Sequence, residues 1–510
     1  RAFSQAGLGF YRGWRVTLDG ALIAPLSGGP VSGTGPWIFQ YQRLRYDPVA
    51  HAREFLKKLD HRSALAILSG VPDHWFTSDD ERGLHATEML IGLLMADRHG
   101  GETFRLERLK TALHHFNRAC TWVPYFSAPY ICMANFWRNG GWPDRGRRLL
   151  ETANTALRDS LIEEELKNYT TAGPEVVPCV IPPFDATRPL QILFMCHPES
   201  DFGSDVLHDG LRRVLGPENV VGFPWKPVLH GLDDGAATGY PCTFQWPEPE
   251  IPLETLLRQV AEGRFDVILY SDTLGSLPRE ATQALLQAAK DTPVFVVDMW
   301  DQCGNAIEAI IERDRLQSVA GFFKREMLRG AHYFEPTWPL LFSYPDDRIA
   351  PDLSWENREG IFWAGKRMGG ARVLQLDWLL GRLPVTPEVG APYSQEEYAR
   401  KLQRHLMGIS LPGNGFDTVR YWELPAHGTL LLSERPPLVI PHDFEDGKHA
   451  VFFDTVSELR DKAKYYIEHR DEALAIAQAG HGHLLAHHTG TARARECLGH
   501  IQRRLATLNR

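Results

Sequence analysis

The amino-acid sequence predicts an α/β protein in which an α-helical part precedes two units that each contain a parallel sheet. Three observations lead to this prediction. The chain has 510 residues, which is longer than a single domain with one hydrophobic core usually is. Apolar residues recur at helix-like intervals between about residues 48 and 170. From residue 190 onwards, short apolar runs alternate with amphipathic helical segments, and this alternation is typical of doubly wound sheets.

Composition narrows the class of protein. The chain is 43% apolar and 23% charged, as expected for a folded, water-soluble protein. The formal net charge of -9 argues against general nucleic-acid binding, because phosphate backbones attract basic surfaces. No apolar run is long enough to span a membrane, so we expect a cytoplasmic protein.

Cysteine and histidine patterns do not indicate a metal. The seven cysteines are scattered and form no Cys-x-x-Cys pair, which favours neither a zinc site nor a disulfide framework. Near the C-terminus four histidines lie at helical spacing, but without a His-Glu-x-x-His pattern they are better explained as a polar helix face: His481, His483, His487 and His488. The sequence therefore predicts no metal site.

The chain begins with an irregular segment, residues 1–46, to which we assign no function, and a helical domain follows at residues 47–170. Within this domain small and aromatic residues recur at the spacing of a repeat: Ala112, Phe116, Ala119, Pro124, Tyr130, Met133, Ala134, Trp137, Gly146, Leu150 and Ala153. This pattern resembles tetratricopeptide repeats, in which small residues let paired helices approach closely. The alternative is an unrelated helical bundle. Repeats of this kind usually bind proteins, so we expect a protein partner here.

A proline-rich linker at residues 171–189 separates the helices from the first α/β unit, residues 190–350. The strands and helices of this unit are expected, in chain order, at 190–196, 204–215, 265–270, 278–290, 293–298 and 306–313. The second unit, residues 351–510, begins with a strand that runs into a basic glycine loop containing Lys366 and Arg367, and it ends in three helices at 456–468, 472–485 and 491–505. The sequence thus predicts two sheets in one chain.

The most informative stretch lies between the predicted strands 408–411 and 429–433. It contains a glycine loop and a helix that carries Arg420 and Glu423 three residues apart, on one helix face. In such a unit, backbone N–H groups and the positive end of the helix lie where phosphate groups bind. An arginine there can clamp a diphosphate, and a carboxylate can accept the hydroxyls of a ribose. The alternative is an ordinary surface ion pair.

Ordered motifs extend from this stretch to the end of the chain: Asp417 to Glu423, Ala426 to Leu432, Phe444 to Val451, Ser457 to Leu459, Lys464 to Tyr466, Ala477 to Gly480, and His488-Thr489. They resemble the carboxyl-terminal domain of GT-B glycosyltransferases, most closely the CgeB-like group of family-1-type enzymes. The resemblance covers roughly residues 360 to 500 and matches the preceding α/β unit more loosely, through 321–326 and 333–334. It implies two facing Rossmann-like domains with a nucleotide-sugar donor between them, bound mainly by the second.

The resemblance also implies roles for particular residues. By position, Glu423 matches the ribose-binding carboxylate and Arg420 the arginine near the diphosphate, while Lys366 or Arg367 matches the basic residue after the first strand. Asp417 and Thr418, at the start of the same motif, complete the expected donor-binding set. Fixed cations and helix N–H groups can stabilise a leaving diphosphate, so neither a metal nor another cofactor is expected.

One position departs from the family. Many retaining GT-B enzymes carry a second glutamate eight residues before the ribose-binding one, and here that position is Gly415. The sequence therefore leaves open whether the anomeric configuration is retained or inverted.

On the acceptor side, His197 follows the first strand, and Asp201 and Asp205 lie on the next loop and helix start. A hydroxyl acceptor needs a base, which a histidine or carboxylate could supply, so these three are the candidate catalytic residues. The alternatives are a loop histidine without a chemical role, and helix capping by the two aspartates.

These observations predict a glycosyltransferase that moves a sugar from a nucleotide diphosphate to an acceptor, with a protein acceptor recruited by the helical part. Three alternatives remain open: a polysaccharide, lipid or small-molecule acceptor, a nucleotide-sugar 2-epimerase of the same architecture, and a non-catalytic scaffold with a degenerate transferase domain.

Overall fold

The protein is described from a computed structural model. The structure describes residues 15–16, 22–23, 102–122, 127–139, 142–169, 179–232, 242, 244–304, 307–329, 331, 333–350, 353–365, 372–388 and 394–508. The helices expected between residues 47 and 101 lie outside these residues, as do the predicted site residues Lys366 and Arg367. No helix within the described residues is long and apolar enough to cross a membrane.

The chain divides into two compact units. The first unit comprises Arg1–Val176, Gly369–Trp378 and Asp454–Glu458, and the second comprises the rest, with both of the larger sheets. In the first unit, strands β1 (Arg15–Val16) and β2 (Leu22–Ile23) form a short antiparallel pair. The next described elements are the helices α6 (Glu102–Trp122), α7 (Ser127–Asn139), α8 (Pro143–Leu157) and α9 (Ser160–Leu166).

Residues of the repeat pattern are buried among these helices, apart from Pro124, which lies outside the described residues. Ala112, Ala119, Ala134 and Trp137 are buried. Gly146 on α8 permits a close approach to α7, because a Cβ there would lie 2.6 Å from the carbonyl oxygen of Ala134. The helical prediction is confirmed by α6, α7, α8 and α9, while the tetratricopeptide assignment stays a prediction.

The first large sheet contains six parallel strands in the order β4-β3-β5-β6-β7-β8. Its strands are β3 (Ile192–Cys196), β4 (Val220–Phe223), β5 (Val267–Ser271), β6 (Val294–Asp298), β7 (Val319–Lys324) and β8 (Thr337–Pro339). The connecting helices are α10 (Phe202–Leu215), α11 (Leu253–Ala261), α12 (Arg279–Ala288) and α13 (Ile307–Asp314), with single turns η3 (Pro217–Asn219), η4 (Pro227–Leu229) and η5 (Asp346–Arg348). The predicted alternation of strands and helices is confirmed here.

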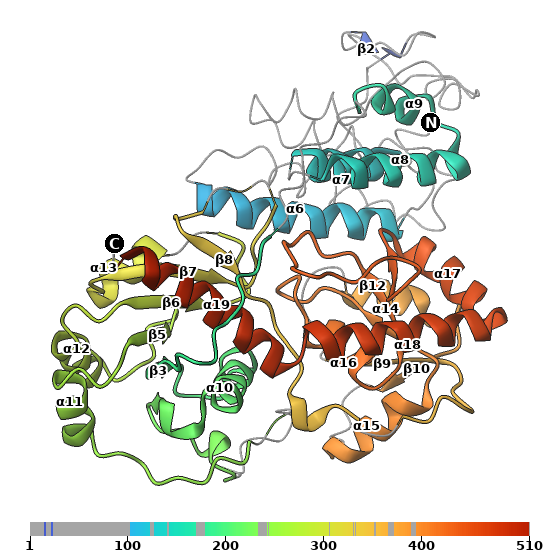
Figure 1. Ribbon diagram of the computed structural model, residues 1–510. Helices are drawn as coiled ribbons and strands as arrows, with labels where there is room; N and C mark the ends of the chain where they lie inside the picture. The colour runs from blue at the N-terminus through green and yellow to red at the C-terminus, as the bar shows by residue number, and fades with distance from the viewer. Residues whose placement is uncertain are drawn as a thin grey trace. The chain divides into compact units, whose positions relative to one another are not determined.

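Helices cover both faces of this sheet (Figure 1). Leu193, Ile268 and Val296 point to one face, where α11, α12 and α13 pack. The alternate residues of the same strands, such as Phe194 and Leu269, point to the other face. Because both faces are buried, the strands are nearly continuous apolar runs rather than alternating ones.

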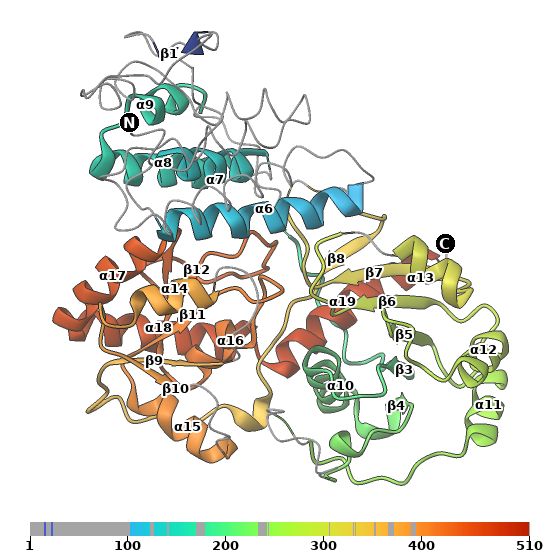
Figure 2. The same ribbon diagram turned by 180° about the vertical axis from the view of Figure 1, so that it is seen from behind.

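The second large sheet contains five parallel strands in the order β10-β9-β11-β12-β13. Its strands are β9 (Ile361–Ala364), β10 (Val385–Glu388), β11 (Met407–Ser410), β12 (Leu430–Glu434) and β13 (Val451–Phe453). Helices α15 (Gln395–Arg404), α16 (Val419–Ala426) and α18 (Arg470–His487) lie beside these strands (Figure 2). Helix α14 (Arg372–Leu379) belongs almost entirely to the first unit, and α17 (Val456–Glu468) begins in a segment of that unit. In both sheets the strand order reverses direction beside the first strand, β3 or β9, and ligands of doubly wound sheets bind at such points.

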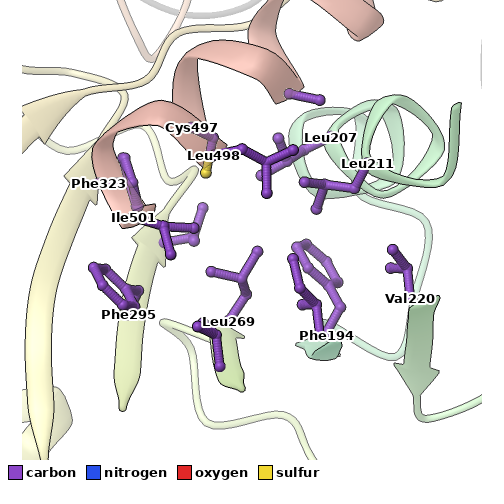
Figure 3. Packing of buried hydrophobic residues seen from close by; sticks show 14 of the residues in the cluster. Phe194, Leu207, Leu211, Val220, Leu269, Phe295, Phe323, Cys497, Leu498 and Ile501 are labelled. Carbon is purple, nitrogen blue, oxygen red and sulfur yellow. The ribbon is translucent and has the colours of Figure 1, made fainter. Parts of the chain in front are cut away.

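The last helix, α19 (Gly490–Leu508), packs in the core of the first sheet. Cys497, Leu498 and Ile501 lie against Phe194 and Phe323, in the core that α10 also covers (Figure 3). Gly210 of α10 allows this contact, because a Cβ there would collide with the carbonyl group of Gly490. From the sequence we assigned residues 351–510 to the second unit, and the packing of α19 on the first sheet was not expected.

Candidate active site

Helix α16 begins at the carboxyl edge of the second sheet. It follows β11 through a loop of residues 411–418, and Thr418 is its N-cap residue. Thr418 does not cap the helix with its side chain, because its Oγ1 lies 3.0 Å from Oγ of Ser410. The first N–H groups of α16 are therefore not satisfied by the N-cap side chain, and such groups attract anions.

Arg420, in the first turn of α16, extends to the end of β9. A Cβ on Gly365 would collide with Nη2 of Arg420, so glycine at 365 makes room for the guanidinium group. The Cζ atom of Arg420 lies 5.8 Å from the ring centre of Trp363. Its Nε is buried without a hydrogen-bond partner among the described residues. The cation thus lies between β9 and β11, where the strand order of the sheet reverses.

Glu423 lies one turn further along α16 and is buried, with 5% of its surface exposed. Its Oε2 accepts a hydrogen bond of 2.9 Å from the hydroxyl of Tyr398 on α15. Burial raises the pKa of Glu423, while the charge of Arg420 and the Tyr398 hydrogen bond oppose the rise. A buried carboxylate bonded to a tyrosine is not half of a surface ion pair, so that alternative is excluded.

Asp417 has a different environment from the one expected of a ligand-binding residue. Its Oδ1 accepts a hydrogen bond of 2.8 Å from the indole of Trp422, and its Oδ2 accepts one of 2.7 Å from the backbone N–H of Phe342. Burial raises the pKa of Asp417 to about 6, although the charge of Arg325 opposes the rise. These contacts fasten the glycine loop to the chain segment that follows the first sheet.

Sequence reasoning missed the residues at the end of β7, where Arg325 and Glu326 are buried. Glu326 accepts hydrogen bonds from the backbone N–H groups of Phe416 and Asp417, at 3.0 and 2.9 Å. Arg325 donates from Nη1 to the carbonyl oxygen of Asp417 at 2.8 Å and from Nη2 to the carboxylate of Asp301. The signal was present in the sequence, because charged residues directly follow an apolar strand.

This arrangement explains Gly415. A Cβ at this position would lie 2.5 Å from Oε1 of Glu326 and 2.6 Å from Oδ1 of Asp301. No larger residue fits there unless these carboxylates move. Two carboxylates that come from the first sheet thus lie against Gly415.

The three acceptor-side candidates lie together at the carboxyl end of β3, but in different environments. His197 is half-buried, and its Nδ1 accepts a hydrogen bond of 3.2 Å from the backbone N–H of Glu199. Asp201 accepts a hydrogen bond from Ser204, and its own N–H donates to Oδ2 of Asp205 at 3.0 Å. Asp205 is also paired with Lys226, and both side chains are buried. Asp205 therefore binds a backbone N–H at the start of α10, whereas the side chain of Asp201 caps no N–H group of this helix.

The C-terminal histidines contact backbone carbonyl groups. Nδ1 of His481 lies 2.9 Å from the oxygen of Pro425, and Nε2 of His483 and of His488 lie 2.6 and 2.8 Å from the oxygen of His442. Among the described residues, no group of three or more histidines, cysteines and acidic residues is arranged to hold a metal ion.

Residues 367–499 match a protein family described as glycosyl transferase-like. No curated protein matches the chain. Among solved structures, HepE of Anabaena in complex with UDP and glucose has 12% identity and a TM-score of 0.42, covering 62% of this chain and 100% of its own.

Two further structures are similar over different lengths. A mutant O-GlcNAc transferase of Thermobaculum terrenum has 14% identity and a TM-score of 0.32, covering 89% of this chain and 98% of its own. Sucrose-phosphate synthase from Thermosynechococcus elongatus has 14% identity and a TM-score of 0.38, covering 62% of this chain and 99% of its own. Because these scores lie below 0.5, the assignment rests on the family match. Residues 367–499, which contain α16 with Arg420 and Glu423, are a glycosyl transferase-like domain, as the sequence predicted.

Proposed function

We propose that this domain binds a nucleotide-diphosphate sugar at α16 and transfers the sugar to an acceptor, as a GT-B enzyme. The observation that carries the proposal is the position of Arg420 and Glu423 at the carboxyl edge of the second sheet, where its strand order reverses. The diphosphate lies against the first turn of α16 and Arg420, and Glu423 accepts hydrogen bonds from the ribose hydroxyls.

The reaction breaks the bond between the anomeric carbon of the sugar and the diphosphate, whose oxygen keeps the electron pair. An acceptor hydroxyl forms the new bond to that carbon and gives up its proton. His197, at the corresponding edge of the first sheet, is the candidate base. Arg420 and the helix N–H groups stabilise the departing diphosphate, so the proposal requires no metal or other cofactor.

Other features complete the proposal. Residues 190–350 form the acceptor side and residues 351–510 the donor side, although α19 packs in the core of the first sheet. The motif order from Asp417 to Thr489 supports membership of the CgeB-like group, and the protein acts in the cytoplasm.

The helical part, 47–170, is a tetratricopeptide-like domain that recruits a protein acceptor. The burial of its repeat residues supports this assignment.

A thermal-shift panel of UDP, GDP, TDP and CMP sugars tests the donor proposal. A ligand at about a hundredfold its Kd stabilises the folded chain by about 2.7 kcal/mol, which raises the melting temperature. We expect at least one sugar nucleotide to do so. If none of them changes the melting temperature, the chain does not bind this class of donor and the proposal fails.

A deletion of residues 1–170 tests the protein acceptor. We expect the truncated chain to lose transfer to protein and to retain nucleotide-sugar binding, which serves as the control for folding. Protein glycosylation at the full-length rate would remove the recruiting role of the helices.

A further inference from the structure

Arg325 is a buried cation surrounded by three carboxylates. Glu326 and Asp417 approach its Nη1 to 3.3 and 3.9 Å, and Asp301 contacts its Nη2. The side chains of Glu326 and Asp417 are almost fully buried, whereas the side chain of Asp301 is 43% exposed. Of the three carboxylates, Asp301 is therefore the one that a ligand can reach.

The two buried carboxylates are also occupied by protein donors. Both oxygens of Glu326 accept backbone N–H groups of the glycine loop. Both oxygens of Asp417 accept hydrogen bonds as well, from Trp422 and Phe342. Their role is to join the glycine loop to the first sheet, whereas the side chain of Asp301 reaches the surface.

The guanidinium group of Arg325 places Asp301 close to the start of α16. Its Nη2 contacts Asp301, while its Nη1 donates to the carbonyl oxygen of Asp417, the residue before the N-cap of α16. Oδ1 of Asp301 would lie 2.6 Å from a Cβ on Gly415 in the same loop. Asp301 is thus fixed beside the helix end to which the diphosphate is assigned.

We propose that Asp301 accepts hydrogen bonds from hydroxyl groups of the sugar that is attached to the diphosphate. The inference rests on the proposed function and assigns a residue of the first sheet to the donor sugar. In a nucleotide-diphosphate sugar the sugar follows the second phosphate directly, so it lies next to the helix end that binds the diphosphate. An ionised carboxylate accepts hydrogen bonds from neutral hydroxyls, and Arg325 fixes its orientation.

The neighbouring residue supports this assignment. Trp300 is an exposed aromatic residue after the end of β6, and its backbone N–H donates to Oδ1 of Asp298 at 3.0 Å. An indole offers a flat apolar surface to the C–H face of a sugar ring, while a carboxylate binds its hydroxyls. A carboxylate next to an exposed aromatic residue is a combination suited to carbohydrate.

Calorimetric titration of the full chain tests the inference. UDP and UDP-glucose form one pair of probes, and GDP and GDP-mannose form the other; the readout is the ratio of the Kd of the sugar nucleotide to that of the free nucleotide. For Asp301→Asn we expect this ratio to rise about tenfold for the pair that the wild type binds, with the Kd of the free nucleotide unchanged.

Asp347→Asn is the matched control, because Asp347 is also an exposed carboxylate paired with an arginine, Arg213. We expect it to leave both Kd values unchanged. An unchanged ratio in Asp301→Asn would overturn the inference, and so would an equal loss of affinity for the free nucleotide, which indicates a purely structural role. If the wild type binds neither pair nor any other sugar nucleotide of the thermal-shift panel, the proposed function itself fails and the inference fails with it.

Discussion

Two Arg–Glu pairs with the same spacing have different environments in this chain. Arg493 and Glu496 on α19 form a buried ion pair, with 2.5 Å between Nη1 and Oε2. Arg420 and Glu423 have the same three-residue spacing, but Arg420 lies against Gly365 and Glu423 binds Tyr398. Spacing places two side chains on one helix face, and only the tertiary neighbours decide whether they pair.

The raised pKa of Glu423 predicts a pH dependence of donor binding. Two ribose hydroxyls require an ionised carboxylate acceptor, and burial raises the pKa of Glu423 above its ordinary value of 4.5. Affinity therefore falls as the pH falls through that raised pKa. Titrations between pH 8 and 4 of the sugar nucleotide that the thermal-shift panel identifies check this, because its diphosphate does not titrate in that range. Affinity that is constant down to pH 4, below the ordinary value of 4.5, would contradict the role of Glu423.

Gly415→Ala is expected to destabilise the chain by roughly 1–3 kcal/mol, because the added methyl group overpacks a site with fixed neighbours. Its Cβ would lie 2.5 Å from Oε1 of Glu326, which two backbone hydrogen bonds hold in place. Gly482→Ala is the control, because a Cβ there meets nothing within 4 Å. Thermal unfolding of both variants measures the difference. Equal stabilities of the two variants would show that the loop around Gly415 rearranges to accept the methyl group.

The sequence alone identified the site residues on α16, but not the residues of other elements that hold the glycine loop before this helix. Arg420 and Glu423 belong to one local strand–loop–helix unit, whose pattern is visible over a few residues. Glu326 contacts Phe416 from 90 positions away, and no local pattern records that contact. The contact of Asp417 with Phe342 and that of Asp205 with Lys226 could not be predicted for the same reason, because each partner lies outside the local unit.

At the scale of elements, hydrophobic periodicity predicted the three terminal helices, which the structure contains as α17, α18 and α19. The pattern shows that a helix has an apolar face, but it does not identify the surface on which that face packs. Helix α19 packs in the core beside α10, and this packing depends on backbone contacts that only glycine permits, such as that between Gly210 and Gly490.

Leu498→Ala tests the packing of α19. Leu498 is fully buried in the core of the first sheet, so its truncation is expected to cost about 2–5 kcal/mol of unfolding free energy. Leu508→Ala on the same helix is the control, because Leu508 is an exposed residue. Denaturant unfolding measures both variants. A similar small effect in the two would mean that α19 does not pack on this sheet.

At the scale of the whole molecule, length and the alternation of strands and helices sufficed to predict two parallel sheets after a helical part. Long apolar strands with helices between them leave few other solutions. The joint between the two sheets, which consists of the hydrogen bonds of Arg325 and Glu326 with the backbone of Asp417, could not be predicted. These residues follow a strand of one sheet, and the loop that they bind belongs to the other. This joint brings residues of the first sheet to the start of α16.

The central claim is that α16 binds a nucleotide sugar through Arg420 and Glu423. The most direct measurement compares the Kd of the sugar nucleotide identified by the panel in Glu423→Gln and Glu496→Gln. Both variants neutralise a buried glutamate three residues from an arginine, and burial raises the pKa of each. We predict about tenfold or greater weakening for Glu423→Gln, because hydrogen bonds to a charged acceptor are lost, and no change for Glu496→Gln. Equal affinities in the two variants and the wild type would contradict the claim.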